Sequence, residues 1–554
     1  MADANNKEAA LLEPAEVVSR YPDHGYTVTG LLASRAQALP DKVCLVFEDR
    51  SWTYSELARD VEHMASWLLE KGVGHGDRVG VFSTNHPSTA MLFLALARIG
   101  GVMVPVNPEF GVREAAYVLN NAQVRGVVCA PEAYERTMQA CATLADAPWV
   151  VLNETGPDGA STLDDELSAA PRCSIASVAS PDATCVFIYS SGTTGAPKGA
   201  MHGQRGYVIT AESFVVRMYL QPEDRILCVL PLFHINALFY SLGGALAAGA
   251  TLVLARRFTA RGFWKMVAES RSTTVNLIGA AANILTKRDR SEYVAGHALH
   301  KAFIAPLDAS LVDVFRDQFN VPTLIECYGM TEIPGVLANP FKGRRKLGSM
   351  GQVSPHLAPG LPQPRLRIVD ENFADLPAGS QGQLLVSTPT IMQGYYGDPE
   401  RTQAAFHDGW FITGDIAWRD DDDFYWFVAR QKDVIRCRGE NISGAELDRV
   451  IGSHPDVLEA AAIGVPSDLG EEDVLAVVVA RPGSNMAAAD IARWVAGQLA
   501  AIKVPKYVVF TDVLPKTATH RVEKFKLKAD RELLARAMAT SAASQPSNIT
   551  GAAG

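Results

Sequence analysis

The chain has 554 residues, of which 48% are hydrophobic and 20% charged, and its formal net charge is −10 at pH 7. This length and balance predict a globular protein of more than one domain. The acidic charge argues against a general nucleic-acid binder, because such a protein needs a net basic surface to neutralise phosphates.

The cysteines and the two ends of the chain indicate where in the cell the protein is expected. Eight cysteines are scattered without a Cys-x-x-Cys pair, which favours buried thiols in a reducing environment over a disulfide framework or a zinc site. Residues 1–20 are polar and acidic, so we expect no secretory signal there. The closing Thr-Gly-Ala-Ala-Gly carries no targeting tripeptide or lipidation cysteine. We therefore expect a cytoplasmic protein.

The first third of the chain alternates between strand and helix patterns. Strand patterns at Val43–Glu48, Arg78–Phe82 and Val102–Val106 are separated by helical ones, and Thr53-Tyr-Ser-Glu56 is a capping box that opens a helix. Such alternation predicts a parallel, doubly wound sheet with helices on both faces. The same rhythm returns over residues 184–325.

A glycine- and hydroxyl-rich stretch, Tyr189-Ser-Ser-Gly-Thr-Thr-Gly-Ala-Pro-Lys-Gly199, follows the apolar run Thr184–Ile188. Glycines let backbone N–H groups approach an anion, hydroxyls donate to phosphate oxygens, and Lys198 adds a mobile positive charge. The spacing differs from that of the nucleotide-binding P-loop. A plain surface turn is the alternative, but so dense a donor cluster after a strand favours a phosphate cradle.

The run Ile226–Ala255 lacks Asp, Glu, Lys and Arg and is long enough to span a bilayer. Pro231, His234 and Asn236 interrupt it, and its end is β-branched, so we expect loop, buried helix, turn and buried strand instead of a membrane span. His234 is suited to lining a site, although on its own it is more simply a core histidine.

Two carboxylate-bearing stretches each end a predicted strand. Glu326-Cys-Tyr-Gly-Met-Thr-Glu332 follows the buried run Pro322–Ile325, at the strand end where doubly wound folds bind ligands. Tyr328 is suited to stacking on a base, and Glu332 to holding Mg²⁺, which prefers hard oxygen ligands. Asp415 closes the second stretch and is suited to paired sugar hydroxyls. An incidental acid in a loop is the alternative for each.

Short strand patterns between Gly and Pro turns predict a small β-barrel-like unit over about residues 340–429. Within it, Asp420–Asp423 indicates a solvated hairpin turn more than a metal site. Residues 429–443 then carry four cations without proline, and they are suited to a working hinge or to a plain charged connection. A capping box at Ser443–Glu446 opens a compact α+β domain, and residues 537–554 are expected to be disordered.

Taken together and in this order, four of these stretches resemble those of the adenylate-forming acyl-CoA synthetases, the superfamily that also holds luciferases and amino-acid adenylation domains. The resemblance covers about residues 28–530. It implies an α/β protein whose large N-terminal domain has two doubly wound subdomains and the small β unit, followed by a small mobile α+β domain. The expected boundaries are an N-terminal tail at 1–27, the AMP-binding domain at 28–431, the C-terminal domain at 432–536 with its hinge at Lys432, and a tail at 537–554.

The resemblance also implies residue roles. Tyr328 stacks on adenine, Thr331 contacts a phosphate, Asp415 and Arg430 bind the ribose, and Lys198 contacts pyrophosphate. The implied ATP- and AMP-binding residues are Ser190, Ser191, Gly192, Thr193, Thr194, Gly195, Lys198, Ala305, Pro306, Glu326, Cys327, Tyr328, Gly329, Met330, Thr331, Asp415 and Arg430. Glu332 and Thr194 would hold the metal, and Arg438, Gly439 and Glu440 would line the path to coenzyme A. The family's usual glycine before Ala305-Pro306 is Ile304 here.

The implied reaction has two steps and uses ATP, Mg²⁺ and coenzyme A. A carboxylate attacks the α-phosphate of ATP to give acyl-AMP and pyrophosphate, and the thiol of coenzyme A then displaces AMP. Catalytic groups implied by the resemblance are Thr194, Lys198, His234, Glu332 and a cation near the C-terminus. The C-terminal domain is expected to rotate about Lys432 between the two steps.

The chain departs from the family at that last cation. The family's Pro-Lys-Thr-x-x-Gly-Lys stretch reads Pro515-Lys-Thr-Ala-Thr-His-Arg521 here, so Arg521 replaces the catalytic lysine. The two side chains are not interchangeable, since a guanidinium is broad and planar. Arg521 as the adenylation cation is the favoured interpretation; Lys524 in its place, or an impaired enzyme, are the alternatives.

The acyl pocket implied by the resemblance is mostly small or apolar: His234, Ala237, Leu238, Ile278, Gly279, Ala280, Gly329 and Ile333. His234 stands where amino-acid adenylation domains carry an aspartate, which argues against amino acids. We expect a medium- or long-chain fatty acid or another bulky apolar acid. Alternatives are an acyl-AMP ligase that loads a carrier protein, a carnitine/crotonobetaine- or terpenoid-acid ligase, and a weakened nucleotide-binding relative. A homodimer is left open.

Overall fold

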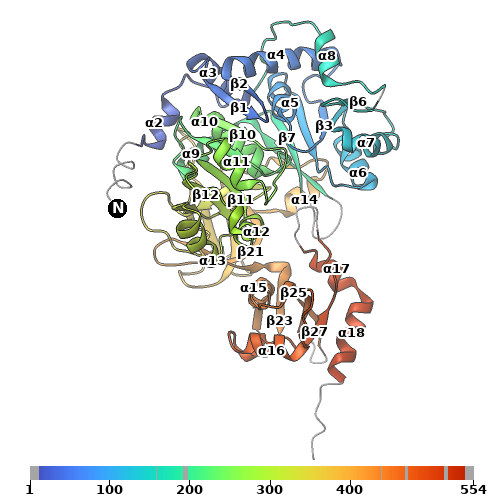
Figure 1. Ribbon diagram of the computed structural model, residues 1–554, viewed down its shortest axis with the longest axis vertical. Helices are drawn as coiled ribbons and strands as arrows, with labels where there is room; N and C mark the ends of the chain where they lie inside the picture. The colour runs from blue at the N-terminus through green and yellow to red at the C-terminus, as the bar shows by residue number, and fades with distance from the viewer. Residues whose placement is uncertain are drawn as a thin grey trace, which may run out of the picture.

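The computed structural model describes residues 11–542 except 158, 191–196, 438–439, 468–471 and 517–521. Figure 1 shows a large N-terminal domain, coloured blue to yellow, above a smaller orange-to-red C-terminal domain. The N-terminal domain contains two seven-stranded sheets and a β unit. This arrangement is the expected α/β architecture.

The first sheet has the order β13-β12-β11-β9-β10-β1-β2, and only β2 runs antiparallel to its neighbour. Its strands are β1 (Val43–Phe47), β2 (Arg50–Thr53), β9 (Arg225–Cys228), β10 (Thr251–Leu254), β11 (Thr274–Ile278), β12 (Lys301–Ala305) and β13 (Thr323–Ile325). The register pairs Ile278 with Ala305 and Phe303 with Ile325. The segments that follow β11, β12 and β13 therefore start at the same edge of the sheet, where parallel sheets bind ligands.

The second sheet has the order β19-β8-β7-β4-β3-β5-β6. Its strands are β3 (Arg78–Phe82), β4 (Val102–Val106), β5 (Gly126–Cys129), β6 (Trp149–Leu152), β7 (Thr184–Ser190), β8 (Lys198–Gly203) and β19 (Gly394–Tyr395). The expected strands at 43–105 are present, but they do not share one sheet. β1 pairs with β10, about 200 residues later, because Leu45 and Phe47 bury their side chains beside Leu252 and Leu254.

Helices from both halves of the domain pack into one hydrophobic core with the sheets. The apolar helix α5 (Pro87–Arg98) is buried from Pro87 to Ala97, and α9 (Gln204–Met218) packs beside it. The capping box is confirmed, since Thr53 Oγ1 accepts from Glu56 N and Glu56 accepts from Thr53 N at the start of α4. The other helices of the domain are α2 (Pro14–Ser19), α3 (Val28–Ala38), α4 (Tyr54–Glu70), α6 (Val112–Ala122), α7 (Tyr134–Cys141), α8 (Leu163–Ala169), α10 (Gly244–Ala248), α11 (Phe263–Glu269), α12 (Gly279–Thr286), α13 (Ala309–Asp313) and α14 (Pro399–Ala404).

The uncharged run at 226–255 and the expected N-terminal tail can both be compared with the structure. The run 226–255 forms β9, a π-helix at Asn236–Gly243, α10 and β10, as the interrupted pattern predicted. Across the described part of the chain, no helix combines the length and apolar character that a membrane span requires. Residues 14–19 of the expected N-terminal tail form α2, which buries Val17 against the main core.

The β unit consists of two antiparallel sheets over a shared core. One contains β14 (Cys327–Met330), β15 (Ile333–Ala338) and β16 (Gln352–Val353). The other contains β17 (Arg365–Val369), β18 (Gly382–Ser387), β20 (Phe406–His407), β21 (Trp410–Arg419) and β22 (Tyr425–Arg430). The long strand β21 brings Asp415 opposite Arg430 on β22.

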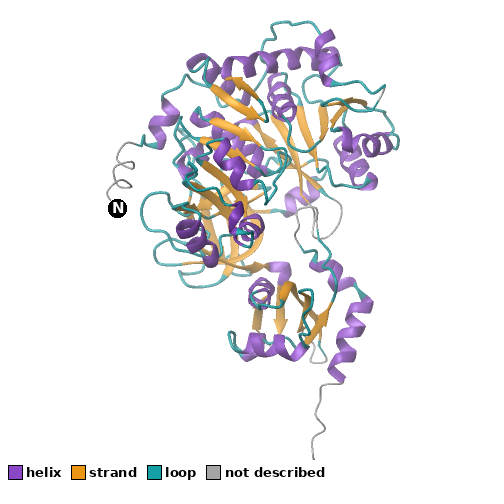
Figure 2. Cartoon of the chain, in the orientation of Figure 1, coloured by secondary structure: helices purple, strands orange, loops and turns teal. Residues whose placement is uncertain are grey.

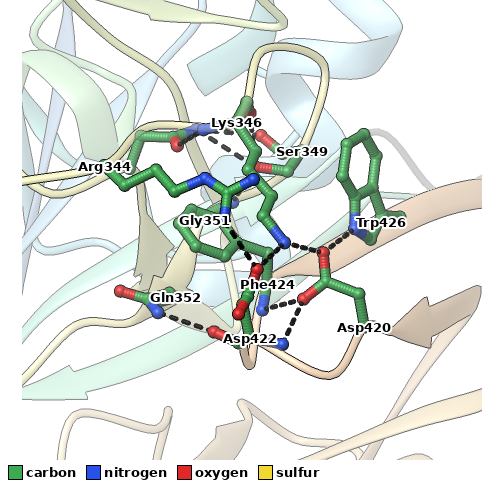
Figure 3. Close-up of polar contacts among 10 residues, drawn as sticks. Arg344, Lys346, Ser349, Gly351, Gln352, Asp420, Asp422, Phe424 and Trp426 are labelled. Carbon is green, nitrogen blue, oxygen red and sulfur yellow. Dashed lines mark hydrogen bonds and ion pairs between the residues drawn. The ribbon is translucent and has the colours of Figure 1, made fainter. Parts of the chain in front are cut away.

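An ionic cluster ties a loop to the β21–β22 turn (Figure 3). Lys346 Nζ lies 2.7 Å from Asp420 Oδ2 and 2.6 Å from Asp422 Oδ2, and Trp426 Nε1 donates to Asp420 Oδ2 at 3.0 Å. Although partial burial by itself would raise it, these hydrogen bonds lower the pKa of Asp420 to about 2. The acidic run is therefore a hairpin turn neutralised by a lysine, and among the described residues no group of three or more His, Cys, Asp or Glu is placed to hold a metal.

The C-terminal domain is a compact α+β unit, drawn as a separate lobe in Figures 1 and 2. Its strands are β23 (Val434–Cys437), β24 (Glu440–Ser443), β25 (Val457–Pro466), β26 (Glu472–Ala480) and β27 (Tyr507–Phe510), and its helices are α15 (Gly444–Gly452), α16 (Ala488–Ala496), α17 (Lys524–Ala529) and α18 (Arg531–Ala542). Ser443 Oγ accepts from Glu446 N as the cap of α15 and donates to Val428 O at 2.6 Å. The expected boundary at 536 falls inside α18, and residues 543–554 lie outside the described part.

Candidate active site

Three residues predicted from separate motifs meet at the end of the β unit. Asp415 is fully buried, and its Oδ1 lies 2.8 Å from Nε of Arg430. The hydroxyl of Tyr328, on β14, donates to Asp415 Oδ2. Burial, together with the Asp415 charge, raises the pKa of Tyr328 well above its usual value, so this phenol stays a donor. The group is a rigid arrangement of one carboxylate, one cation and one aromatic ring.

Glu326 directly follows β13, which pairs with β12, the strand that ends at Ala305. Its Oε1 accepts from Leu307 N at 3.1 Å, whereas Oε2 is buried without a hydrogen-bond partner. Burial raises the pKa of Glu326 to about 7. A buried acceptor that lacks a donor, beside the loop implied to face adenine, fits an exocyclic amine.

Glu332 is nearly buried beside a residue that the motifs did not indicate. Its Oε1 accepts from the hydroxyl of Tyr395 at 2.8 Å, and Nζ of Lys198 lies 5.1 Å from the centre of the Tyr395 ring. Tyr395 thus connects the predicted metal ligand to the predicted phosphate contact. One hard carboxylate fits Mg²⁺, which is commonly held by one or two carboxylates together with substrate phosphates.

Thr331 is positioned by a second residue that the sequence did not reveal. Nε2 of His202, on β8, lies 2.8 Å from the carbonyl oxygen of Thr331. His202 is almost fully buried, and burial lowers its pKa to about 4, so the ring is neutral and acts as a donor to that carbonyl. No motif contains His202; only the packing of β8 against this stretch shows its role.

The residues expected to line an acyl pocket divide into two groups. Ala237, Leu238 and Ile333 are fully buried in the hydrophobic cores, whereas Ile278 and Ala280 are exposed. The glycines between them allow close backbone approach. A Cβ at Gly279 would lie 2.6 Å from Pro306 O, and one at Gly329 would overlap Gly335 N.

His234 lies half-buried at the start of this region, 4.3 Å from Phe233 between ring centres. Burial lowers the pKa of His234 to about 4, so the imidazole is neutral at pH 7. A neutral ring can position a substrate by hydrogen bonding but adds no charge to the site.

Several predicted residues fall outside the described part of the structure: Ser191, Gly192, Thr193, Thr194, Gly195, Arg438, Gly439 and Arg521, with the side chains of Ser190, Lys432 and Glu440. The base of the phosphate loop is described. β7 and β8 pair antiparallel, with Tyr189 opposite Gly199, and the Tyr189 hydroxyl donates to Asn121 Oδ1 at 2.6 Å. The remaining predicted residues, Cys327 and Met330, lie on β14 beside Tyr328.

Comparison with known proteins decides the family. The model of the AMP-binding enzymes matches residues 32–396, and that of the AMP-binding enzyme C-terminal domain matches residues 446–521. The chain belongs to the AMP-binding enzymes. The expected membership of the adenylate-forming superfamily, with an acyl-CoA synthetase-like chain, is thereby confirmed.

Individual members of this family are similar over almost their whole length. An indoleacetate–CoA ligase of Aromatoleum aromaticum is 32% identical over 507 residues, which cover 90% of this chain and 96% of that one. A sulfoacetate–CoA ligase of Cupriavidus necator is also 32% identical, with coverages of 90% and 97%. The structure of ATP-bound MatB from Rhodopseudomonas palustris has a TM-score of 0.79 at 29% identity, covering 91% of this chain and 98% of that one.

This AMP-binding enzyme is therefore an acid–thiol ligase that uses ATP, Mg²⁺ and coenzyme A. The family fixes the type of reaction and leaves the acid open, because the similar ligases carry the names of different acids.

Proposed function

We propose that the described residues form an adenylation site, in which a carboxylic acid with an apolar body becomes acyl-AMP before transfer to coenzyme A. The observation that carries the proposal is the buried group of Tyr328, Asp415 and Arg430. A buried carboxylate that pairs with a cation and accepts from a phenol is fixed in place, which suits it to accept from both ribose hydroxyls. Glu326 offers its unpaired oxygen to the base.

The phosphates of ATP would lie between Lys198 and Glu332. Lys198 supplies positive charge for pyrophosphate, and Tyr395 holds the Glu332 carboxylate in one orientation. Mg²⁺, when bound, neutralises charge that accumulates on the phosphates. The acid's carboxylate oxygen bonds to the α-phosphorus as the bond to pyrophosphate breaks. The thiol sulfur of coenzyme A then bonds to the acyl carbon, and AMP leaves.

Arg521 is the proposed cation that bridges the carboxylate and the α-phosphate. The alternative, Lys524, is already engaged within the C-terminal domain, because its Nζ lies 2.6 Å from Oδ2 of Asp448 and its side chain is largely buried. Moving Lys524 into the active site would leave Asp448 without this partner. The ion pair therefore favours Arg521.

The acid is proposed to be a medium- or long-chain fatty acid or another bulky apolar acid. The residues implied to line the acyl pocket are mostly small or apolar, and the neutral His234 offers no anion for an ammonium group. That feature speaks against the carnitine-like alternative. The relatives named for indoleacetate and sulfoacetate do not favour a simple fatty acid, so a terpenoid or aromatic body and transfer to a carrier protein stay as alternatives.

The test is pyrophosphate exchange into ATP over a panel of carboxylic acids, in the wild type and in the Arg521→Ala and Lys524→Ala variants. We expect exchange with apolar acids, a loss of about 100-fold or more in Arg521→Ala, in line with removal of a transition-state cation, and a smaller loss in Lys524→Ala. Undiminished exchange in Arg521→Ala would contradict the assignment. Thioester formation with free coenzyme A, compared with a carrier protein, separates the two acceptors.

A further inference from the structure

Among the described residues of the N-terminal domain, Arg217 is a buried cation with neither an anion nor a full set of hydrogen-bond acceptors. Arg217, in the last turn of α9, is 4% exposed. Its Nε donates to Ser354 Oγ at 2.8 Å and its Nη2 donates to Gly335 O, but Nη1 is buried without a hydrogen-bond partner. Among the described residues, no carboxylate lies within 4.0 Å of its guanidinium. Burial lowers the pKa of Arg217.

Other buried cations of the same domain are compensated. Arg35, which is fully buried, uses Nε, Nη1 and Nη2 to donate to Leu246 O, Ser34 Oγ and Ala247 O. Lys301 Nζ lies 2.6 Å from Asp224 Oδ2, with both side chains at most 5% exposed. Since burial of an uncompensated charge is costly, the unused donor of Arg217 calls for a partner that the described residues do not provide.

The unused donor packs against Gly335, close to the Tyr240 hydroxyl. Gly335 has a φ of +46°, and a Cβ there would overlap Arg217 Nη1 and lie 3.0 Å from the hydroxyl oxygen of Tyr240. Arg217 Nη1 and the Tyr240 hydroxyl therefore converge beside the Cα of Gly335. Tyr240 ends the segment that begins at His234, and Gly335 packs on Gly329, so both lie next to residues implied to line the acyl pocket.

We propose that Arg217 selects acids that carry a second oxyanion, a carboxylate or a sulfonate, at the end remote from the reacting carboxyl group. The inference rests on the proposed function and refines its substrate class to an acid with an apolar middle and a charged far end. A site built to hydrogen-bond a substrate group discriminates strongly against an analogue that lacks it, because its buried polar groups are then left unpaired. A cation at this place also disfavours a quaternary ammonium substrate.

The experiment compares matched pairs of acids of equal chain length, octanoate with octanedioate and octanoate with 8-sulfooctanoate, by kcat/KM in pyrophosphate exchange. We expect the wild type to favour the doubly charged acids by about 100-fold or more. Arg217→Met, which removes the guanidinium but keeps a long unbranched side chain, should abolish this preference. Equal preference for carboxylate and sulfonate would show that the charge is recognised, and a preference for one would identify the oxyanion.

Three outcomes would overturn the inference. One is a wild type that favours octanoate, which leaves the proposed function intact. The second is an Arg217→Met variant that loses both acids equally, which indicates a purely structural role. The third is exchange with no acid, which removes the proposed function as well. Should Arg217→Met not fold, the wild-type preference alone decides, and Arg35→Met serves as the control for loss of a buried but fully bonded guanidinium.

Discussion

At the scale of single residues, the site contains buried carboxylates that differ in their hydrogen-bond partners. Asp415 is fully buried but paired with Arg430, whereas Glu326 is buried with one oxygen unpaired. Both were singled out from the sequence; Glu326 directly follows β13 as expected, whereas Asp415 lies within β21 and does not end a strand. His202, Arg217 and Tyr395 were not predicted, since their roles come from side-chain packing between distant segments.

Glu326 makes the stability of the N-terminal domain depend on pH. Its pKa is about 7 in the folded chain against 4.5 ordinarily, so between these values the folded state holds a proton that the unfolded state releases. The stabilising effect of that proton is complete below pH 4.5 and is lost as the pH rises through 7. We expect Glu326→Gln to unfold at a higher temperature than the wild type at pH 8, by about 3 kcal/mol in unfolding free energy, and to differ little at pH 4.5.

Thermal unfolding at pH 4.5 and pH 8 checks this expectation. Glu371→Gln, at an exposed position, is the control and should leave the pH dependence unchanged. An unaltered pH dependence in Glu326→Gln would show that Glu326 is not the responsible group.

At the scale of elements, local patterns predicted individual strands and helices but not their partners. β3 and β4 and the capped start of α4 match the predictions, because their signals lie within a few residues. Sheet membership was not predictable in this way. β1 pairs with β10, and β19 adds to the hairpin of β7 and β8, through contacts between residues about 200 apart.

The ion pairs of Lys346 join a loop to the β21–β22 turn, and their contribution to stability can be measured. Lys346 and Asp420 are each 16% exposed, and loss of the cation leaves Asp420 and Asp422 facing each other. We expect Lys346→Met to destabilise the N-terminal domain at pH 7 by more than the loss of a fully exposed ion pair does. The pKa of Asp420 is lowered from 3.8 to about 2, so the contribution is present above pH 3.8 and lost as the pH falls through 2.

Unfolding by urea at pH 7 measures the effect of Lys346→Met. Arg344→Met is the matched control, because Arg344 contacts the same Asp422 at 3.0 Å but is 72% exposed, and its loss should cost less than about 0.5 kcal/mol. Equal destabilisation by the two variants would contradict the view that partial burial makes the Lys346 contact effective.

At the scale of the whole molecule, two domains with their own cores meet at a short connection. The C-terminal domain has separate hydrophobic clusters, and Ser443 Oγ bonds to Val428 O across the connection. The backbone of Lys432 lies in a turn at Gln431–Asp433 between them. Rotation about Lys432, a homodimer and a cytoplasmic location remain predictions, because each depends on a second state, a partner or a cell.

The central claim is that this ligase activates its acid as an acyl adenylate before coenzyme A takes part. The direct measurement is mass spectrometry of the enzyme mixed with ATP, Mg²⁺ and the acid that gives the highest exchange, first without and then with coenzyme A. The account predicts acyl-AMP and pyrophosphate in the first stage, and conversion to acyl-CoA with one AMP released per thioester in the second. Formation of ADP, or of acyl-CoA with no acyl-AMP in the first stage, would contradict it.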